Sequence, residues 1–559
     1  MGVPERRNRV GDAVAAFTSN AVNPNLRRAQ LSFLGAWTAE WAFTVALGIV
    51  AYRDGGAVAV GLVGLLRMLP AAVLAPLLSP IADRGRRERV LVLVSTVRGV
   101  ATAAAALVAA VSGPVAIVYA LAVCSTIAAT LFRPAHSALL PSLCSTGHEL
   151  ASANVVRGLL DSAATLVGPL LAAVLLQIAD VSLVFAVAAA ASLWAALLLA
   201  RVRYDAPPRP PAPRRDLLRE AADGIRAVAR DRDLTIIVGL AGAQAFTRGA
   251  LTVFSVVVAI ELLGTGEPGA GAIMTAVGVG AVVASLFASL LVGTGRLGTW
   301  FAIGVALWGL PITLVGVVPQ QVAALVLLAF VGVGNALIDV AGFTLLGRLA
   351  PDAVLARVFG VLESLVAVCI GIGAVATSAI TAAVGLQPAL IIVGLLCPVL
   401  AAAAWWRLRR LDHAVHELDA DIALLRNVPM LRALPLPSIE QLARGLDTVT
   451  VSSGATVFAQ GEFGDRYFVI ESGTADVIGD GRVVAAIGPG EGFGEIALLR
   501  RTPRTATVVA RTPLHLRALR AAQFLPVVLG YTASARAAEV TVEGELGRYS
   551  PENPSADPA

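Results

Sequence analysis

The sequence contains no lysine, so all 43 of its strongly basic residues are arginines. Charged residues make up only 14% of the 559 residues, and aromatic residues only 5%. Four cysteines lie in or beside apolar segments, without the spacing of metal ligands: Cys124, Cys144, Cys369 and Cys397. We therefore expect buried thiols rather than disulfides, and neither a metal site nor a cofactor.

Several functional motifs are also missing from the sequence. The chain has no phosphate-binding Walker loop, which argues against an ATP-driven pump. It has no nucleophile elbow and no Cys/His pair, so we do not expect an enzyme. No helix-turn-helix pattern is found near the C-terminus, which argues against a transcription factor. The formal net charge of +5 says little about nucleic acid, and we expect no nucleic-acid partner.

Apolar residues, in contrast, make up 57% of the chain and dominate it from about Leu31 to Trp406. A helix needs roughly 20 apolar residues to cross the hydrocarbon core of a membrane. Twelve candidate spans are found at 30–52, 57–81, 90–112, 114–134, 153–178, 181–200, 235–263, 270–293, 297–318, 321–347, 354–384 and 386–406. They predict an all-α polytopic membrane bundle of twelve transmembrane helices in two six-helix halves, 30–200 and 235–406.

The arginines gather on one side of these spans. They precede the first span, fill the loop after the second, and crowd the linker 201–234, which also carries a predicted amphipathic helix. Because cytoplasmic loops are enriched in basic residues, we expect both termini in the cytoplasm, including the N-terminal segment 1–29. The expected location is a bacterial inner (plasma) membrane, and the polar start of the chain predicts no cleavable signal peptide.

The two halves echo each other in sequence. Residues 42–44 recur as 245–247, and a Gly-x-Leu-acid pattern at 158–161 recurs at 360–363. Such internal repeats are typical of secondary transporters.

The loop between the second and third spans reads Ile81-Ala82-Asp83-Arg84-Gly85-Arg86-Arg87. It resembles the cytoplasmic signature loop of the major facilitator superfamily. Segments 131–141 and 154–169 are similar to the branch of that family that exports siderophores and macrolides. The resemblance implies a transporter in which a charge relay gates the cycle, formed by Asp83, Arg84, Arg86 and Arg87.

Ionisable residues inside predicted spans are costly in hydrocarbon and are therefore functional candidates. The candidates for transport or proton coupling are Glu40, Arg98, Asp161, Arg248, Asp339 and Glu363. Glu40 lies deepest in the first span, and Arg98 and Arg248 are candidate partners for it or for an anionic substrate. Asp161 and Glu363 lie nearer to the cytoplasmic face, where a pair such as Arg157 with Asp161 would only lock helices together.

From about Leu424 the sequence changes to short strands separated by glycine turns. Strands are expected at 448–451, 456–459, 467–471, 475–478, 483–487, 506–510 and 514–519, after two short helices of which the second has Ser438 as its N-cap. We predict a small cytoplasmic β-roll or jelly-roll domain with flanking helices over 422–547. A connector helix at 407–421 would precede it, and a disordered tail at 548–559 would follow.

Between two of these strands stands a short helix entered through glycine, with an arginine nine residues after a glutamate. Amides at a helix start and a nearby arginine suit a phosphate. The pattern resembles the phosphate-binding cassette of cyclic-nucleotide-binding domains. The resemblance implies that Glu495 holds a ribose hydroxyl and Arg504 the cyclic phosphate, in a site made of Phe493, Gly494, Glu495, Ile496, Ala497, Arg504, Thr505 and Ala506.

Together these patterns predict a secondary-active, proton-coupled exporter of small molecules that a cytosolic cyclic nucleotide regulates allosterically. The favoured regulatory ligand is cAMP, with cGMP as the alternative. The expected partners are the lipid bilayer, a small-molecule substrate and the nucleotide, with the chain a monomer or dimer. Two other functions stay open: a nucleotide-sensing receptor or scaffold without transport, and an exporter of the cyclic nucleotide itself. The transporter-like halves and the lack of a filter-like loop argue against a cyclic-nucleotide-gated channel.

Overall fold

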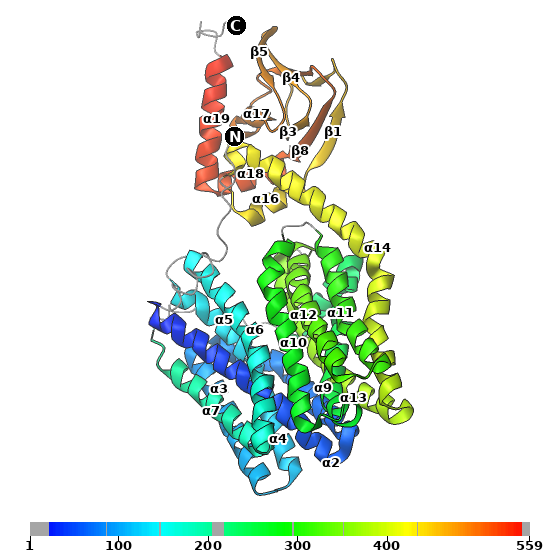
Figure 1. Ribbon diagram of the computed structural model, residues 1–559. Coiled ribbons are helices and arrows are strands. Elements are labelled where there is room, and N and C mark those ends of the chain that lie inside the picture. The colour runs from blue at the N-terminus through cyan, green and yellow to red at the C-terminus, as the bar shows by residue number, and fades with distance from the viewer. Residues whose placement is uncertain are drawn as a thin grey trace. The chain divides into compact units, whose positions relative to one another are not determined.

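The computed structural model describes residues 22–84, 86–144, 147–203, 217–292, 296–349, 352–432 and 434–549. The chain divides into two compact units, Met1–Arg409 and Arg410–Ala559 (Figure 1). We call the first unit the bundle and the second the tail.

The bundle is helical throughout its described part. Its helices are α2 (Pro24–Arg84), α3 (Arg87–Ala110), α4 (Val115–Ala129), α5 (Phe132–Leu143), α6 (Gly147–Ile178), α7 (Val181–Ala200), α8 (Leu217–Arg230), α9 (Arg232–Val257), the π-helical turn η1 (Val258–Leu262), α10 (Gly266–Val292), α11 (Leu297–Val317), α12 (Gln321–Leu349), α13 (Asp352–Val384) and α14 (Leu386–Asn427), which runs on into the tail.

Eleven helices in the described part of the chain are long and apolar enough to cross a membrane. The first of them, α2, is two helices joined at a sharp kink, because Gly55 and Gly56 leave the helical conformation. Gly56 has a φ of 63°, which glycine adopts without steric cost. The two arms of α2 coincide with the first two predicted spans, so the twelve predicted spans correspond to these eleven helices, and the predicted all-α bundle is confirmed.

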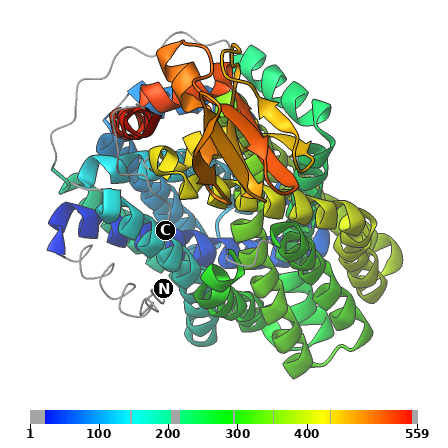
Figure 2. The same cartoon turned by 90° about the horizontal axis from the view of Figure 1, so that it is seen from above.

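The first half of the bundle comprises α2 to α7 and the second comprises α9 to α14 (Figure 2). The halves pack against each other through α2 with α13 and through α6 with α10. Where the second arm of α2 begins, Ser378 Oγ on α13 donates a hydrogen bond of 2.7 Å to the carbonyl of Ala57. The linker helix α8 packs on α13, with Gly224 against Arg357 and Val361.

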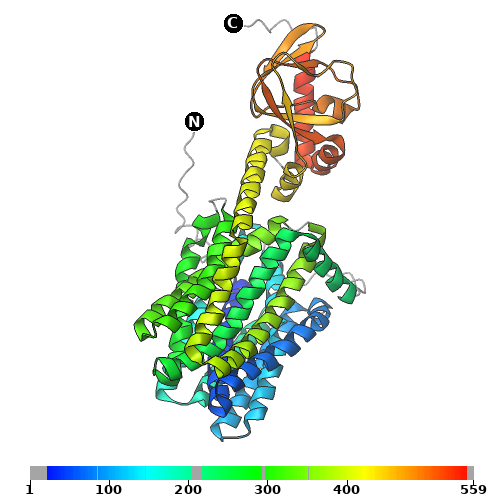
Figure 3. The same ribbon diagram turned by 90° about the vertical axis from the view of Figure 1, so that its right-hand side faces the viewer.

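The tail contains two four-stranded antiparallel sheets, one in the order β1-β8-β3-β6 and the other β2-β7-β4-β5 (Figure 3). The strands are β1 (Asp447–Val451), β2 (Thr456–Phe458), β3 (Arg466–Ser472), β4 (Ala475–Gly479), β5 (Arg482–Ile487), β6 (Gly492–Phe493), β7 (Thr507–Ala510) and β8 (Leu514–Arg520). All seven predicted strands are present within about two residues of their expected ends. The two-residue strand β6, which pairs with β3, was not predicted.

Five short helices complete the tail: α15 (Pro429–Arg432), α16 (Leu436–Ala443), α17 (Glu495–Arg500), α18 (Ala521–Gly530) and α19 (Thr532–Tyr549). The prediction that Ser438 caps a helix is wrong, because α16 begins at Leu436 with the extended Pro435 as its N-cap. A proline in the first turn starts the helix earlier, since the missing N–H costs nothing there. Ser438 instead lies inside α16 and donates a hydrogen bond to the Tyr531 hydroxyl.

The cysteines differ in exposure. All four are free thiols, with Cys397 buried and Cys144 and Cys369 half-buried. Cys124 is exposed on α4, so the expectation of burial is wrong at this position. An apolar helix of a membrane bundle need not turn every apolar side chain toward other helices, since lipid covers the rest.

Candidate functional sites

The cassette of the tail is built where β6 passes into α17. Phe493 ends β6 in the apolar interior, and Gly494 follows with a φ of 92°, a left-handed conformation that redirects the chain into the helix. Glu495, the first residue of α17, is fully buried. Ile496 and Ala497 are buried beside it.

Arg504 lies in this cassette with only 5% of its surface exposed. Its Nη1 donates to the Gly494 carbonyl at 2.8 Å, and its Nη2 donates to the Arg466 carbonyl at 2.7 Å. The guanidinium lies over the Phe458 ring, 4.0 Å from the centroid. Its own backbone N–H donates to the Glu462 carbonyl at 2.7 Å. These contacts fix the side chain from several directions.

The partners of the Arg504 guanidinium are neutral: two carbonyl groups and an aromatic ring. Burial lowers the pKa of Arg504, and the nearby carboxylates of Asp465, Glu495 and Glu462 oppose that shift. Arginine nevertheless stays protonated in proteins. Within the described residues no carboxylate forms an ion pair with the Arg504 guanidinium, so this buried positive charge is available to bind an anion. The residues present therefore fit a cyclic phosphate.

The two remaining members of the cassette follow Arg504 directly. Thr505 is half-buried, so its hydroxyl is partly accessible. Ala506 is buried and belongs to the apolar interior of the two sheets, so its part in a site would be through the backbone.

In the bundle, Glu40 lies between two buried arginines. Arg98 Nη2 donates to Glu40 Oε2 at 2.6 Å, and Arg67 Nη2 donates to Glu40 Oε1 at 2.9 Å. Arg67 also donates to Thr126 Oγ1, and its guanidinium lies 5.4 Å from the Phe43 ring. The cluster joins both arms of α2 to α3 and α4. Arg98 was expected as a partner of Glu40, but the role of Arg67 was not foreseen.

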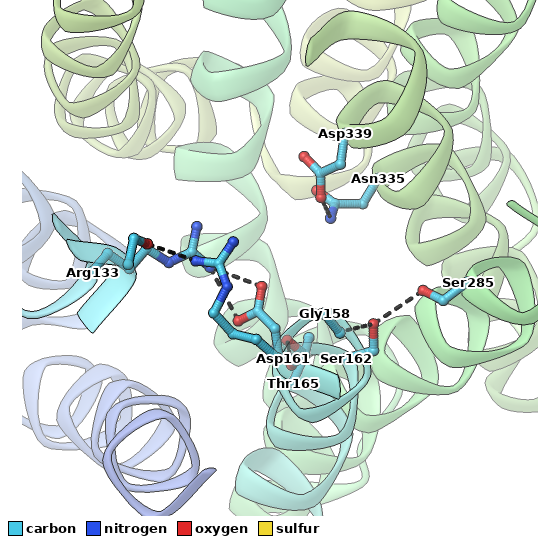
Figure 4. A network of polar contacts seen from close by, with 10 residues as sticks. Arg133, Gly158, Asp161, Ser162, Thr165, Ser285, Asn335 and Asp339 are labelled. Atoms are coloured by element: carbon cyan, nitrogen blue, oxygen red, sulfur yellow. Dashed lines mark hydrogen bonds and ion pairs between the residues drawn. The ribbon is translucent and has the colours of Figure 1, made fainter. Parts of the chain in front are cut away.

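A second group of charges lies between the two halves (Figure 4). Arg133 Nη2 donates to both oxygens of Asp161, at 3.0 and 2.9 Å. From the other half, the side chains of Asn335 and Asp339 on α12 face this pair, and Asn335 Nδ2 donates to Asp339 at 3.0 Å. The Asp339 side chain is exposed, and we call the region between these side chains the charged space. Ser162 and Ser285 join α6 to α10 at 3.0 Å beside the same space.

The expected pair of Arg157 with Asp161 does not form. Arg157 Nη1 instead donates to Ser137 Oγ at 2.9 Å, because Arg133 occupies both oxygens of Asp161. Arg133 also lies 4.9 Å from the Trp37 ring, which holds it toward Asp161.

The two other charged candidates lie on helices of the second half. Arg248 lies over the ring of Trp41 from the first half, 5.8 Å from its centroid, rather than against Glu40. It is within electrostatic reach of Arg133, Asp161, Asp339 and Glu363. Glu363 is exposed.

The predicted signature loop is described only in part. The side chains of Asp83 and Arg84 lie outside the described residues. Arg86 forms an ion pair with Glu88, and Arg87 donates to the carbonyl of Ala138 and to Ser142 Oγ on α5.

Sequence reasoning missed a cluster around Arg53. Arg53 donates two hydrogen bonds of 2.6 Å to Glu267 and forms an ion pair of 2.7 Å with Asp180. Next to it, the Tyr52 hydroxyl donates to Glu261 at 2.6 Å. The bonds to Glu267 and Glu261 join the first half to the second beside the kink of α2, and we call this the Arg53 end of the bundle. Loop charges of opposite sign were visible in the sequence, but their pairing was not.

Both parts of the chain match models of known families. The model of the Major Facilitator Superfamily matches twice, over residues 31–264 and 240–438. The model of the Cyclic nucleotide-binding domain matches residues 448–531.

Individual relatives match a short part of the chain. A cAMP-dependent protein kinase regulatory subunit of Schizosaccharomyces pombe is 40% identical over 95 residues, which are 17% of this chain and 23% of that protein. An uncharacterized protein of Mycobacterium tuberculosis is 45% identical over 89 residues, 16% of this chain and 17% of that protein. The chain thus spans less than a quarter of the length of these two relatives.

Solved structures also match part of the chain. The regulatory domain of Toxoplasma gondii PKA with cAMP is 25% identical, with 24% of this chain and 52% of that chain covered and a TM-score of 0.22. The family models cover the bundle and the tail between them. The chain therefore belongs to the Major Facilitator Superfamily and carries a C-terminal cyclic nucleotide-binding domain.

Proposed function

We propose that this protein is a secondary-active, proton-coupled exporter of small molecules, and that cAMP bound to its tail regulates transport. The observation that carries the regulatory part is Arg504, a buried cation whose partners are neutral and whose position is fixed. A cyclic phosphate would supply the missing negative charge. The names of the kinase relatives favour cAMP over cGMP.

The transport part rests on the family and on the charged space between the halves. Asp339 accepts a hydrogen bond from the neutral Asn335 and is exposed, as is Glu363. Among the described residues neither carboxylate has an arginine as a hydrogen-bond partner, whereas Glu40 and Asp161 do. We therefore propose Asp339 and Glu363 as the groups that exchange protons, and Glu40 and Asp161 as groups that hold helices.

We further propose that the Arg53 end faces the outside and that both termini and the tail are cytoplasmic. The arginine-rich segments support this orientation. With the halves joined at the Arg53 end, the charged space would then be reached from the cytoplasm, where an exporter loads its substrate.

Nucleotide binding is tested by calorimetric titration of cAMP and cGMP into the purified full-length chain. We expect binding to be lost in Arg504→Ala and retained in Arg482→Ala, a matched change of an exposed arginine on β5. Equal binding by both variants would contradict the assigned site.

Regulation and transport are tested in proteoliposomes that contain a pH-sensitive dye. A panel of anionic, neutral and cationic compounds is added, and proton movement is followed with and without cAMP. We expect a compound-dependent proton flux that cAMP changes by about 5- to 150-fold, the usual range of allosteric coupling. The Asp339→Asn variant should lose the proton flux and keep cAMP binding. Nucleotide binding without any flux would indicate a receptor or scaffold instead.

A further inference from the structure

The charged side chains between the halves differ in whether they have hydrogen-bond partners. Asp161 is satisfied by Arg133, and Asp339 by Asn335. The side chains of Asp339 and Glu363 are exposed. Among the described residues, neither Asp161 nor Asp339 has a buried oxygen without a hydrogen-bond partner.

Arg248 differs from these acids because it is half-buried. Within the described part of the chain, no hydrogen bond or ion pair to its guanidinium is found, and the guanidinium lies over the Trp41 ring, 5.8 Å from its centroid. A stacked guanidinium keeps its edge free, and that edge presents parallel N–H groups that match a carboxylate or a phosphate. Leaving these donors unpaired and partly desolvated is unfavourable, so an anion there would be favoured.

Arg157 adds a second unsatisfied donor on the opposite half. Its Nη1 bonds to Ser137, but its Nε is buried and has no hydrogen-bond partner among the described residues. Arg157 precedes Asp161 by one turn of α6, so the two side chains lie on the same face of that helix. Both halves thus offer spare N–H donors, one on each side of the space.

Apolar rings lie beside these charges. Phe343 is one helical turn from Asp339 on α12, and Phe359 is one turn from Glu363 on α13, so each shares a face with its acid. The two rings stack with centroids 5.6 Å apart, and Phe343 is 47% exposed. An exposed aromatic pair next to charged groups is suited to the apolar body of a ligand.

We propose that the substrate of this site is an organic anion, with its carboxylate or phosphate held by Arg248 and its apolar body against Trp41 and the Phe343–Phe359 pair. This inference rests on the proposed transport function and narrows it to one class of substrate. Arg157 would approach the same anion from the first half as the halves close around it.

The test compares three probes of equal shape and different charge: 1-naphthoate, 1-naphthamide and 1-naphthamidine. Binding is measured by the thermal stabilisation of the full-length chain that carries Arg504→Ala, so that the tail does not contribute. We expect naphthoate to stabilise the protein most. Arg248→Gln should weaken naphthoate binding about tenfold or more, because charge-assisted hydrogen bonds are lost.

Two further variants keep the test decisive. Arg248→Lys retains the charge but not the planar fork, so it should bind naphthoate with an affinity between those of the parent and Arg248→Gln. Arg226→Gln, a change in an exposed ion pair of α8, should bind like the parent. Stabilisation by the amide or amidine equal to that by naphthoate, no stabilisation by any probe, or full naphthoate binding by a folded Arg248→Gln would each overturn the proposal. Naphthoate binding without proton-coupled flux would instead contradict the transport function and leave the anion site standing.

Discussion

Arg504 in the tail and Arg98 in the bundle are both buried, yet their partners differ in kind. Arg504 is held by two backbone carbonyls and the Phe458 ring. Arg98 is held by the carboxylate of Glu40, which it shares with Arg67. Neutral partners fix the position of a guanidinium and leave its charge available, whereas a carboxylate neutralises it.

The difference separates a binding arginine from a structural one. A buried cation with neutral partners gains most from an external anion, so Arg504 is suited to a ligand. A buried ion pair is instead costly to break, since the remaining partner is left uncompensated. Arg248 lies between the two cases, with an aromatic partner and no carboxylate bonded to it in the described residues.

Breaking the structural cluster should have the largest effect. Glu40→Gln leaves two buried arginines without a carboxylate, so the bundle should lose about 3–5 kcal/mol of stability. The measurement is the loss of the folded full-length chain with temperature or denaturant, in detergent. Glu363→Gln, the same change at an exposed carboxylate, should stay within about 0.5 kcal/mol of the parent. A Glu40→Gln chain as stable as the parent and defective only in proton flux would favour proton coupling at Glu40.

Displacing the binding arginine without removing its charge should have the next largest effect. A Cβ at Gly464 would lie 2.2 Å from Arg504 Cζ, so Gly464→Ala should push the guanidinium out of place. We expect cAMP affinity to fall by about 2 kcal/mol, roughly thirtyfold, through loss of charge-assisted hydrogen bonds. Calorimetric titration measures the change. Gly488→Ala, where a Cβ would meet nothing within 4 Å, is the control. Unchanged affinity in Gly464→Ala would indicate that the observed position of Arg504 is not the one that binds phosphate.

Much of the fold could be predicted from the sequence because its helices and strands follow patterns in consecutive residues. Apolar runs of spanning length predicted the crossings, and period-two alternation with glycine turns predicted seven strands of the tail. The two-residue strand β6 carries too short a pattern to be seen. The start of α16 was misplaced because Ser438 is a strong capping residue, whereas the N-cap is Pro435, three residues earlier, and Pro437 lies in the first turn of the helix.

The nucleotide cassette could be predicted from the sequence more fully than the charged groups of the bundle, because only the cassette residues are close together in the chain. The cassette residues are close together in sequence, so a motif can place Glu495 relative to Arg504. In the bundle, Arg53 bonds to Glu267 and Arg133 to Asp161, and sequence gives the residues but not which sides of the helices meet. Arg157 was expected to pair with Asp161 from the adjacent turn, but Arg133 on α5 donates to both oxygens of Asp161 instead.

A smaller effect is expected from removing the Phe458 ring, one of the neutral partners of Arg504. Phe458→Leu keeps an apolar side chain and removes the ring face under the guanidinium. We expect cAMP affinity to fall by about 1 kcal/mol, roughly fivefold, the range of a partly buried cation–π contact. Phe463→Leu changes a ring that is 87% exposed and should have no effect on the titration. Equal affinities of the two variants would show that the two carbonyl groups alone fix Arg504.

The smallest effect is expected at the Arg53 end, where the ion pairs are exposed. The side chains of Arg53 and Glu267, which pair across the halves, are 44% and 29% exposed, and partly exposed pairs of this kind contribute less than about 1 kcal/mol each. Arg53→Gln should therefore leave the melting temperature nearly unchanged and favour separation of the halves by no more than about fivefold.

Maleimide labelling of Ala173→Cys, in a chain without other cysteines, measures this separation, since Ala173 is buried against Gly271 between the halves. Arg53→Gln should label faster than the parent at low salt. The difference between the two labelling rates should become smaller in high salt, because screening weakens the same ion pairs in the parent. Labelling that is equally slow with and without Arg53 would mean that helix packing alone closes this end, and the ion pairs would then be consequences of closure rather than its cause.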